Sequence, residues 1–259
     1  MQESSGVLLE CCLEGVESAI RARDGGGHRI ELCANLAQGG VTPSVGDIKG
    51  AVSAVSGSDT KVHVLIRPRP GDFVYSTVEH QVMVDDVNAA VHAGANGVVI
   101  GSLLADGGID EKATQELVQA AARAAAPRSC SVTFHRAFDC CTTEPLVALE
   151  TLIRLGVDRV LTSGRAESAW DGREVIAALV QAGTGRIGIM PGAGVTRVNA
   201  AKLLLHTGAR EVHVGSACHE SVPGSQRYAV SLGPSDRGPS VDIKRVSEHL
   251  VSEMLQALR

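Results

Sequence analysis

The sequence predicts an α/β fold, a single TIM-type (β/α)8 barrel with parallel strands. Short runs of apolar, β-branched residues alternate with longer stretches of helical period, and the alternation repeats about eight times. A barrel of this kind commonly uses such a length as one domain, which we expect to span residues 1–259. The first predicted strand is followed by Cys12-Leu13-Glu14-Gly15, and not by the glycine-rich phosphate loop of an open doubly wound sheet.

The predicted strands have one apolar and one polar face. In the third strand, Val62 and Val64 have the opposite parity to His63 and Arg67. If the apolar parity faces the helices, the polar parity faces a shared barrel interior. The eight predicted strands, in chain order, are Val7–Cys12, Arg29–Cys33, Lys61–Ile66, Gly97–Ile100, Ser131–His135, Arg159–Leu161, Arg186–Met190 and Glu211–Val214.

Helices are expected between these strands, several of them starting after Ser, Thr, Asp or Pro and ending near Gly. The segment Ser221–Ser240 is rich in Ser, Gly and Pro, and it is predicted to be a flexible loop before the last helix. The predicted helices are Val16–Arg23, Ser44–Val55, Val78–Ala93, Glu111–Ala124, Pro145–Leu155, Arg173–Gln181, Asn199–His206 and Ile243–Leu258.

Composition argues against several classes of partner. The net charge is −5 and aromatic residues make up 2% of the chain, which disfavours nucleic acid and anionic membrane surfaces. The sequence shows no secretory signal and no apolar run near the roughly 20 residues of a membrane-spanning helix. Seven cysteines without a C-x-x-C pair predict reduced thiols in the cytoplasm.

The chemistry is expected at the carboxyl ends of the strands, where barrels of this fold carry their sites. The interior parity is unusually polar at these ends, which points to a shared polar cavity. The residues with this parity are Glu10, Cys12, Glu31, Cys33, His63, Arg67, Thr133, His135 and His213.

One class of site is metal capture by Cys12 and Cys33. Neighbouring strands lie about 4.8 Å apart, so two thiols at matching heights could bind a soft, low-coordinate ion such as Cu(I). Glu10 and Glu31 lie one interior step below, and negative neighbours raise the pKa of a thiol, which disfavours the thiolate. The alternative is that both cysteines are small buried residues filling a crowded strand end.

A second class of site is acid–base catalysis on a small polar substrate, for which groups with separated pKa values are needed. The alternative is that these charges pair with one another as a structural ion network. The candidates are the carboxylates Glu10 and Glu31, the imidazoles His135 and His213, and the guanidiniums Arg67 and Arg136.

A third feature is the run Met190–Thr196, with Gly192 and Gly194, followed after the next strand by Val214–Ala217. Small residues leave backbone N–H groups open, and this pair of loops is the usual phosphate position in the fold. The same glycines could instead serve to make tight turns.

Several long phrases in fixed order closely resemble the CutC family, the so-called copper homeostasis proteins. The resemblance runs from about Leu8 to Ser216. The phrases are Arg29–Cys33 (RIELC), Gly39–Ser44 (GGVTPS), Ile66–Tyr75 (IRPRPGDFVY), Thr133–Asp139 (TFHRAFD), Val160–Gly164 (VLTSG) and Met190–Gly194 (MPGAG).

The resemblance implies a TIM-type barrel that assembles as a homo-oligomer in the cytoplasm and handles intracellular copper. It also implies Cu(I) binding by the cysteines that match Cys12 and Cys33. The family's polar pocket would map onto Arg67, Arg69, His135, Arg136 and Asp139.

Two hypotheses of function follow, and a purely structural barrel remains a third. The first is binding of one Cu(I) ion per subunit by Cys12 and Cys33. The second is an enzyme acting on a small anionic or phosphorylated metabolite. In that hypothesis Glu10 or Glu31 is the base, His135 is the acid, and Arg67 with Gly192–Gly194 holds the anion.

Overall fold

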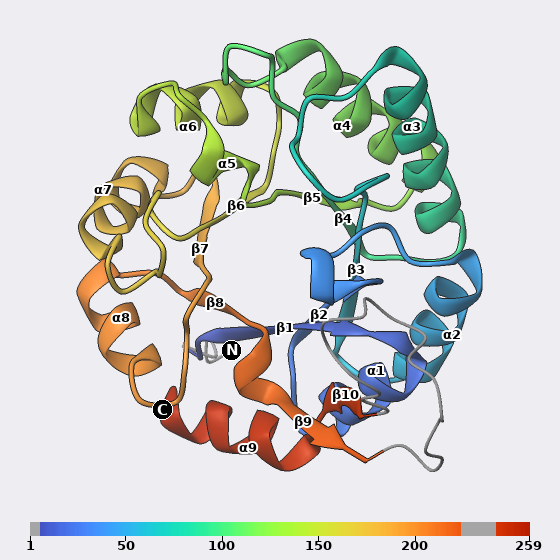
Figure 1. The fold of residues 1–259 in the computed structure, drawn as a ribbon, viewed down its shortest axis with the longest axis vertical. Coiled ribbons are helices and arrows are strands. Elements are labelled where there is room, and N and C mark those ends of the chain that lie inside the picture. Colours follow the sequence, from blue (N-terminus) through green and yellow to red (C-terminus); the bar gives the residue numbers. More distant parts are fainter. Residues whose placement is uncertain (1–5, 224–241) are drawn as a thin grey trace, which may run out of the picture.

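The computed structural model describes residues 6–223 and 242–259, and it confirms the predicted barrel of parallel strands surrounded by helices (Figure 1). Hydrogen-bonded neighbours follow the order β7-β6-β5-β4-β3-β2-β1-β8. β7 also contacts β8, so the sheet curves into a nearly closed ring. The barrel strands are β1 (Leu8–Glu14), β2 (Arg29–Cys33), β3 (Lys61–Leu65), β4 (Gly97–Ile100), β5 (Ser131–Phe134), β6 (Arg159–Thr162), β7 (Gly188–Pro191) and β8 (Glu211–Val214).

Helices cover the outside of the ring. α3 begins at a capping box, in which the Ser76 side chain accepts the Glu79 amide and the Glu79 carboxylate accepts the Ser76 amide. Pro145 opens α6, where its missing N–H costs nothing. The helices are α1 (Gly15–Asp24), α2 (Val45–Val55), α3 (Thr77–His92), α4 (Glu111–Ala125), α5 (Ala137–Cys140), α6 (Pro145–Arg154), α7 (Arg173–Gly183), α8 (Ala200–Thr207) and α9 (Glu248–Ala257), with 3₁₀ turns η1 (Leu36–Gln38) and η2 (Ser216–Cys218).

The predicted division of the strands into two faces is confirmed. On β1, Leu9 and Leu13 belong to the large core between sheet and helices. A separate small cluster lies inside the barrel and contains Cys12, Cys33, Leu65 and Val99. The interior therefore carries both sulfur and a short apolar wall.

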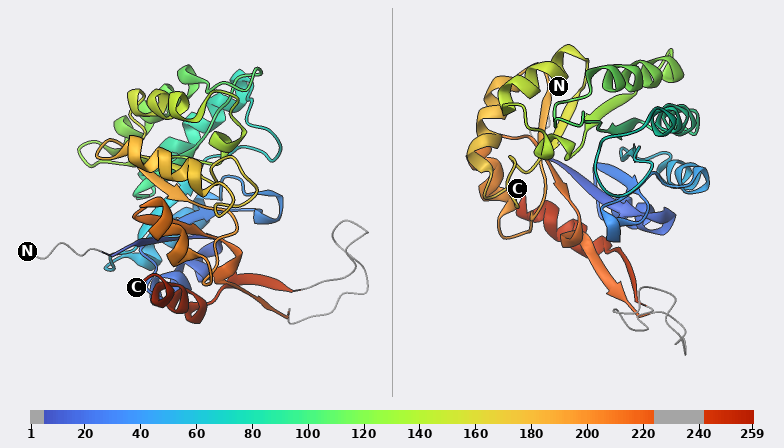
Figure 2. Two further views of the ribbon diagram at one scale, coloured as in Figure 1. Left: turned by 90° about the vertical axis from the view of Figure 1, so that its left-hand side faces the viewer. Right: turned by 45° about the horizontal axis from the view of Figure 1, so that its top comes forward.

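The predicted last helix is wrong in its first residues. Ile243–Val246 forms a strand, β10, which pairs antiparallel with β9 (His219–Val222), and α9 begins only at Glu248. This hairpin extends away from the barrel (Figure 2). Pairing with β9 satisfies the backbone hydrogen-bonding groups of Ile243–Val246 that a helix would satisfy internally. Sequence periodicity does not indicate that a partner strand is present.

The predicted loop Ser221–Ser240 is only partly described. Ser221 and Val222 belong to β9, and residues 224–240 lie outside the described residues. Among the described residues, no helix combines the length and the apolar character needed to cross a lipid bilayer.

Candidate functional site

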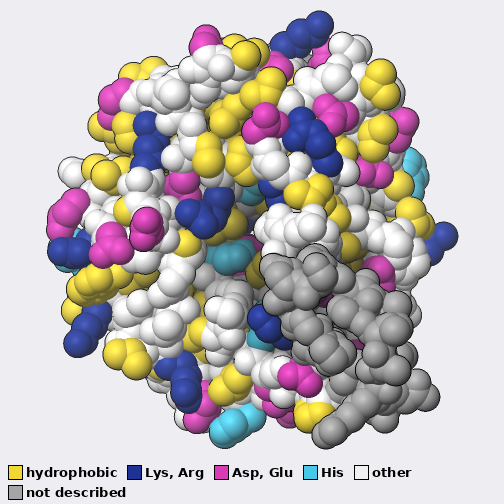
Figure 3. All heavy atoms as spheres, in the orientation of Figure 1, with side chains coloured by type: hydrophobic (Ala, Val, Ile, Leu, Met, Phe, Trp, Pro, Cys, Tyr) yellow, Lys and Arg dark blue, Asp and Glu magenta, His cyan; other side chains and the backbone are white. Residues whose placement is uncertain are grey.

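A cavity of about 150 Å3 opens at the carboxyl ends of the strands, where the sequence places the site. Histidine side chains and the side chains of lysine or arginine are visible near the centre of this face (Figure 3). The cavity is lined by Cys12, Glu31, Cys33, Leu36, Gly39, Leu65, Arg67, Phe73, His135, Arg136, Leu161 and His213.

The two thiols meet in one wall of the cavity. The Sγ atoms of Cys12 and Cys33 are 3.8 Å apart, and both residues are buried. They do not sit at matching heights, because Cys12 is opposite Glu31 and Cys33 is opposite Glu14 in the strand register. The side chains nevertheless converge across this offset of two residues.

A carboxylate completes the sulfur wall. The Cys33 thiol lies 3.6 Å from Glu31 Oε2, and one ligand atom from each of Cys12, Glu31 and Cys33 lies within 4.8 Å of the others. Two sulfur donors and one oxygen donor can hold a metal ion, and thiolates favour soft ions.

The surroundings make Cys12 the more acidic thiol of the pair. A hydrogen bond from Cys33 lowers the pKa of Cys12 well below its usual range, and His213 lowers it further, against the opposing effect of burial. The same hydrogen bond, together with burial, raises the pKa of Cys33. The expected repulsion by carboxylates therefore does not dominate at Cys12.

His213 and Glu31 hold the protons around this thiolate. Burial lowers the pKa of His213, but hydrogen bonds to Cys12 and Glu10 outweigh burial and raise it well above the usual value. Burial and the charge of Cys12 raise the pKa of Glu31. These shifts favour the charged form of His213, the ionised form of Cys12 and the protonated form of Glu31.

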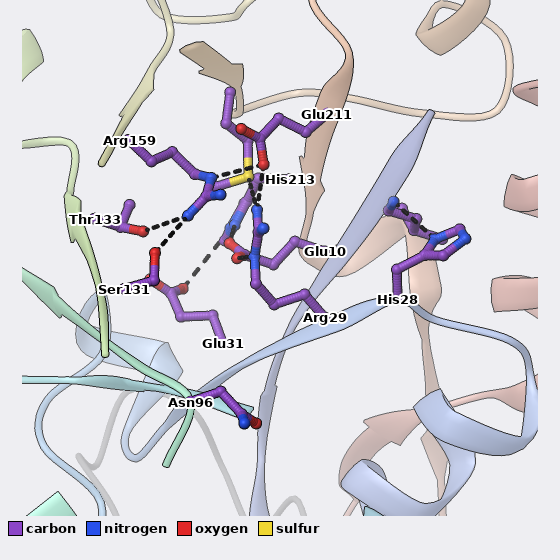
Figure 4. A network of polar contacts seen from close by, with 12 residues as sticks. Glu10, His28, Arg29, Glu31, Asn96, Ser131, Thr133, Arg159, Glu211 and His213 are labelled. Atoms are coloured by element: carbon purple, nitrogen blue, oxygen red, sulfur yellow. Dashed lines mark hydrogen bonds and ion pairs between the residues drawn. The ribbon is translucent and has the colours of Figure 1, made fainter. Parts of the chain in front are cut away.

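Glu10 lies below the cavity in a layer of ion pairs (Figure 4). Its two oxygens contact Arg29 Nε and His213 Nδ1, the latter at 2.8 Å. Burial raises the pKa of Glu10, but the charge of Arg29 and the hydrogen bond with His213 outweigh burial and hold it below its usual range. Glu10 does not line the cavity, and its contacts position His213.

The ion layer continues across the barrel floor. Glu211 Oε2 accepts Arg29 Nη2 at 2.7 Å and Arg159 Nε at 2.6 Å, and Arg159 Nη1 reaches Thr133 Oγ1 at 3.3 Å. Of the charged residues considered from the sequence, Glu10 and His213 belong to this network. Its other members, which the sequence reasoning did not name, are Arg29, Arg159 and Glu211. Glu31 reaches the cavity above the network.

Arg67, Phe73 and His135 form a second wall of the cavity. The Arg67 guanidinium lies 5.1 Å from the centre of the Phe73 ring, and the rings of Phe73 and His135 are 4.9 Å apart. The His135 ring also fills space beside Gly101, where any Cβ atom would meet it at 2.3 Å. Burial and the charge of Arg67 lower the pKa of His135 to about 3, so its imidazole is neutral.

Three other predicted site residues are engaged in loop structure. Arg136, which lines the cavity, pairs with Asp139 at 2.8 Å. Asp139 also accepts the Thr162 hydroxyl and the Ser163 amide, which fixes the loop after β6. Arg69 pairs with Glu79 and Asp72 outside the cavity lining.

The glycines after β7 do not line the cavity. The Gly192 amide donates to the Thr162 carbonyl, and the Gly194 carbonyl accepts Asn199 Nδ2. Gly194 has φ = 66°, a conformation that suits a tight turn. Their role in binding an anion stays a prediction.

The sequence reasoning did not assign the apolar lining residues. Leu65 shares the interior parity of His63, so its place could have been read from the strand. Leu36 and Phe73 come from loops, whose paths no periodicity reports, and Leu161 lies on β6.

Comparisons with known proteins agree with the family resemblance found in the sequence. The model of the CutC family matches residues 7–218. The chain is 42% identical to the human "Copper homeostasis protein cutC homolog" over 233 residues, which cover 90% of this chain and 82% of the relative. It is 42% identical over 229 residues to a family protein CutC of Bacteroides fragilis, covering 87% of each.

A solved structure agrees as well. The crystal structure of the putative copper homeostasis protein CutC from Streptococcus agalactiae superposes with a TM-score of 0.75 at 34% identity. The match covers 81% of this chain and 98% of that one.

Proposed function

The chain belongs to the CutC family, and on that premise we propose that it serves copper homeostasis by binding one Cu(I) ion per subunit through Cys12 and Cys33. The observation that carries the proposal is the buried pair of thiols, 3.8 Å apart beside Glu31. A metal–sulfur bond is about 2.3 Å, so one ion can reach both sulfur atoms. Two sulfurs and one oxygen suit a low-coordinate soft ion better than Zn²⁺, which takes four ligands.

The proton arrangement supports this assignment. Thiolates are the form that binds metal, and the lowered pKa of Cys12 supplies one of them. Glu31 Oε2 lies 3.6 Å from the Cys33 thiol and offers an oxygen donor beside the two sulfur atoms. His213, held by Glu10, keeps a positive charge beside the sulfur atoms.

Titration of the reduced protein with Cu(I) against a competing chelator tests the proposal. We expect one equivalent to bind the wild type, and Cys12→Ser with Cys33→Ser to weaken binding at least about a hundredfold, more than an altered neighbour of a ligand usually does. Cys140→Ser with Cys141→Ser removes another pair of thiols and is the matched control. Equal affinity of the two double variants contradicts the assignment.

Catalysis on a small anionic or phosphorylated metabolite is a second candidate function. It is favoured by the presence of Arg67, His135 and Glu31 around one cavity, with Glu31 rather than Glu10 facing it as the base. Its test is solvent-deuterium incorporation into a small anionic carbon acid such as pyruvate, followed by NMR. Catalysis is supported if the wild type accelerates deuterium incorporation and Glu31→Gln does not. It is contradicted if incorporation with the wild type is no faster than without protein.

The location and assembly of the protein belong to the same proposal. Seven free cysteines fit a reducing compartment, and we therefore place the protein in the cytoplasm. We expect it to form a homo-oligomer, which light scattering of the purified protein measures directly.

A further inference from the structure

One cation in the cavity wall has no acidic partner among the residues that the structure describes. The Arg67 guanidinium donates to the carbonyls of Gly40 and Gly71 at 2.8 and 2.7 Å, and its Nε atom is buried without an acceptor. The residue is 7% exposed. Burying a charge is costly unless an opposite charge or a full set of hydrogen bonds accompanies it.

A neutral donor lies on the same wall. His135 Nδ1 accepts the Ala137 amide at 3.1 Å, so the ring proton belongs on Nε2, which is buried without a partner in the described part of the chain. A buried donor without an acceptor also carries a free-energy cost. The residues that carry these two atoms, Arg67 and His135, pack on Phe73 and line the same cavity.

The carboxylate on the opposite wall is not an ion-pair partner of Arg67. Glu31 Oε2 lies 3.6 Å from the Cys33 thiol and 3.9 Å from His213 Nε2. Arg136, the other arginine of the lining, is paired with Asp139. Arg67 is therefore the arginine of this cavity without an ion pair in the described structure.

We propose that this cavity binds a small carboxylate, held between Arg67 and His135 Nε2, with its short carbon chain against Leu36, Leu65 and Leu161. One arginine without an ion pair matches the single charge of a carboxylate better than the higher charge of a phosphate. The leucines and Phe73 suit an apolar tail. A volume of about 150 Å3 holds about five water-sized groups, enough for a chain of two or three carbons.

The inference names a ligand class for the cavity of the second candidate function and requires neither copper nor turnover. If a carboxylate binds but does not react, the binding proposal stands and the catalytic function is contradicted. A failed Cu(I) titration also leaves the binding proposal intact, because the carboxylate is titrated into metal-free protein.

The experiment is calorimetric titration of the metal-free full chain with propionate at pH 7, with propionamide as the uncharged isostere. We expect one site with an affinity of about 1–10 mM for propionate. Propionamide should bind about tenfold or more weakly, because it lacks the charge that Arg67 meets. No binding of propionate up to about 50 mM, or tighter binding of inorganic phosphate, would overturn the proposal.

Variants locate the site. Arg67→Met should weaken propionate binding about ten- to a hundredfold, and His135→Phe, which keeps a ring on Phe73, about tenfold. Arg173 also stacks on an aromatic ring, 4.8 Å from Trp170, but lies outside the cavity lining, so Arg173→Met is the matched control. If Arg67→Met does not fold, His135→Phe decides, and wild-type affinity in that variant refutes the site.

Discussion

At the scale of single residues, the barrel interior separates charges that stabilise the fold from groups that face the cavity. Arg29 lies between Glu10 and Glu211, and all three side chains are largely buried. Glu31 has the same interior parity, but it contacts thiols and His213 instead of an arginine. The nearest charge, and not the residue type, decides which carboxylate is available for chemistry.

Arg29→Met should therefore lower the free energy of unfolding by about 3–5 kcal/mol, because it removes the arginine that two buried carboxylates, Glu10 and Glu211, share. Urea denaturation at pH 7 measures this loss. The matched control is Arg154→Met, whose pair with Glu111 is exposed and should contribute little. Equal losses in the two variants would show that the interior ion layer does not stabilise the fold.

At the scale of elements, the close contact between α1 and α9 depends on a glycine, Gly25, at the end of α1. Gly25 caps α1 with φ = −73°, a conformation open to any residue. A Cβ atom there would lie 2.7 Å from the Glu248 carbonyl oxygen and from Val251 Cβ on α9. The glycine is required by the close approach of the second helix.

Gly25→Ala should destabilise the protein by about 1–3 kcal/mol, because α9 has to shift to accept the methyl group. Gly46→Ala is the control, since its nearest atom would be Ser44 Oγ at 3.6 Å within the first turn of α2. That change should be neutral or stabilise by up to about 1 kcal/mol. Chemical denaturation compares them, and an undiminished stability of Gly25→Ala would contradict the packing argument.

At the scale of the whole molecule, enclosing histidines in the barrel makes stability depend on pH. Burial lowers the pKa of both His63 and His135 to about 3. Below pH 6.5 the unfolded chain binds protons at these positions while the folded barrel does not. Their contribution is therefore fully present above pH 6.5 and is lost as the pH falls towards 3.

His63→Leu isolates one of these contributions. Between pH 7 and pH 5, the stability of the wild type should fall by about 2 kcal/mol more than that of the variant, because each pKa unit corresponds to about 1.4 kcal/mol. Between pH 7 and pH 8 the difference should stay constant, which is the internal control. Parallel pH profiles from 7 to 5 would show that His63 is solvated in the folded protein.

The sequence by itself determined the barrel, its inward polar residues and its family. A period of two follows from backbone geometry at each residue, so the interior parity of Cys12, Cys33 and His135 could be predicted without knowing their neighbours. The long phrases in fixed order were not needed to find this parity. They pointed to the family that the comparisons then confirmed.

Only the tertiary structure decided which of these groups meet. The thiols converge although Cys12 and Cys33 are two positions apart in the register of β1 and β2. Glu10 forms an ion pair with Arg29, and Phe73 reaches the cavity from a loop. Such pairings depend on strand stagger, side-chain rotamers and loop paths, which join residues far apart in the chain. Periodicity is local and carries no information about such pairings. Because the groups are buried, their partners decide which of them can carry a charge.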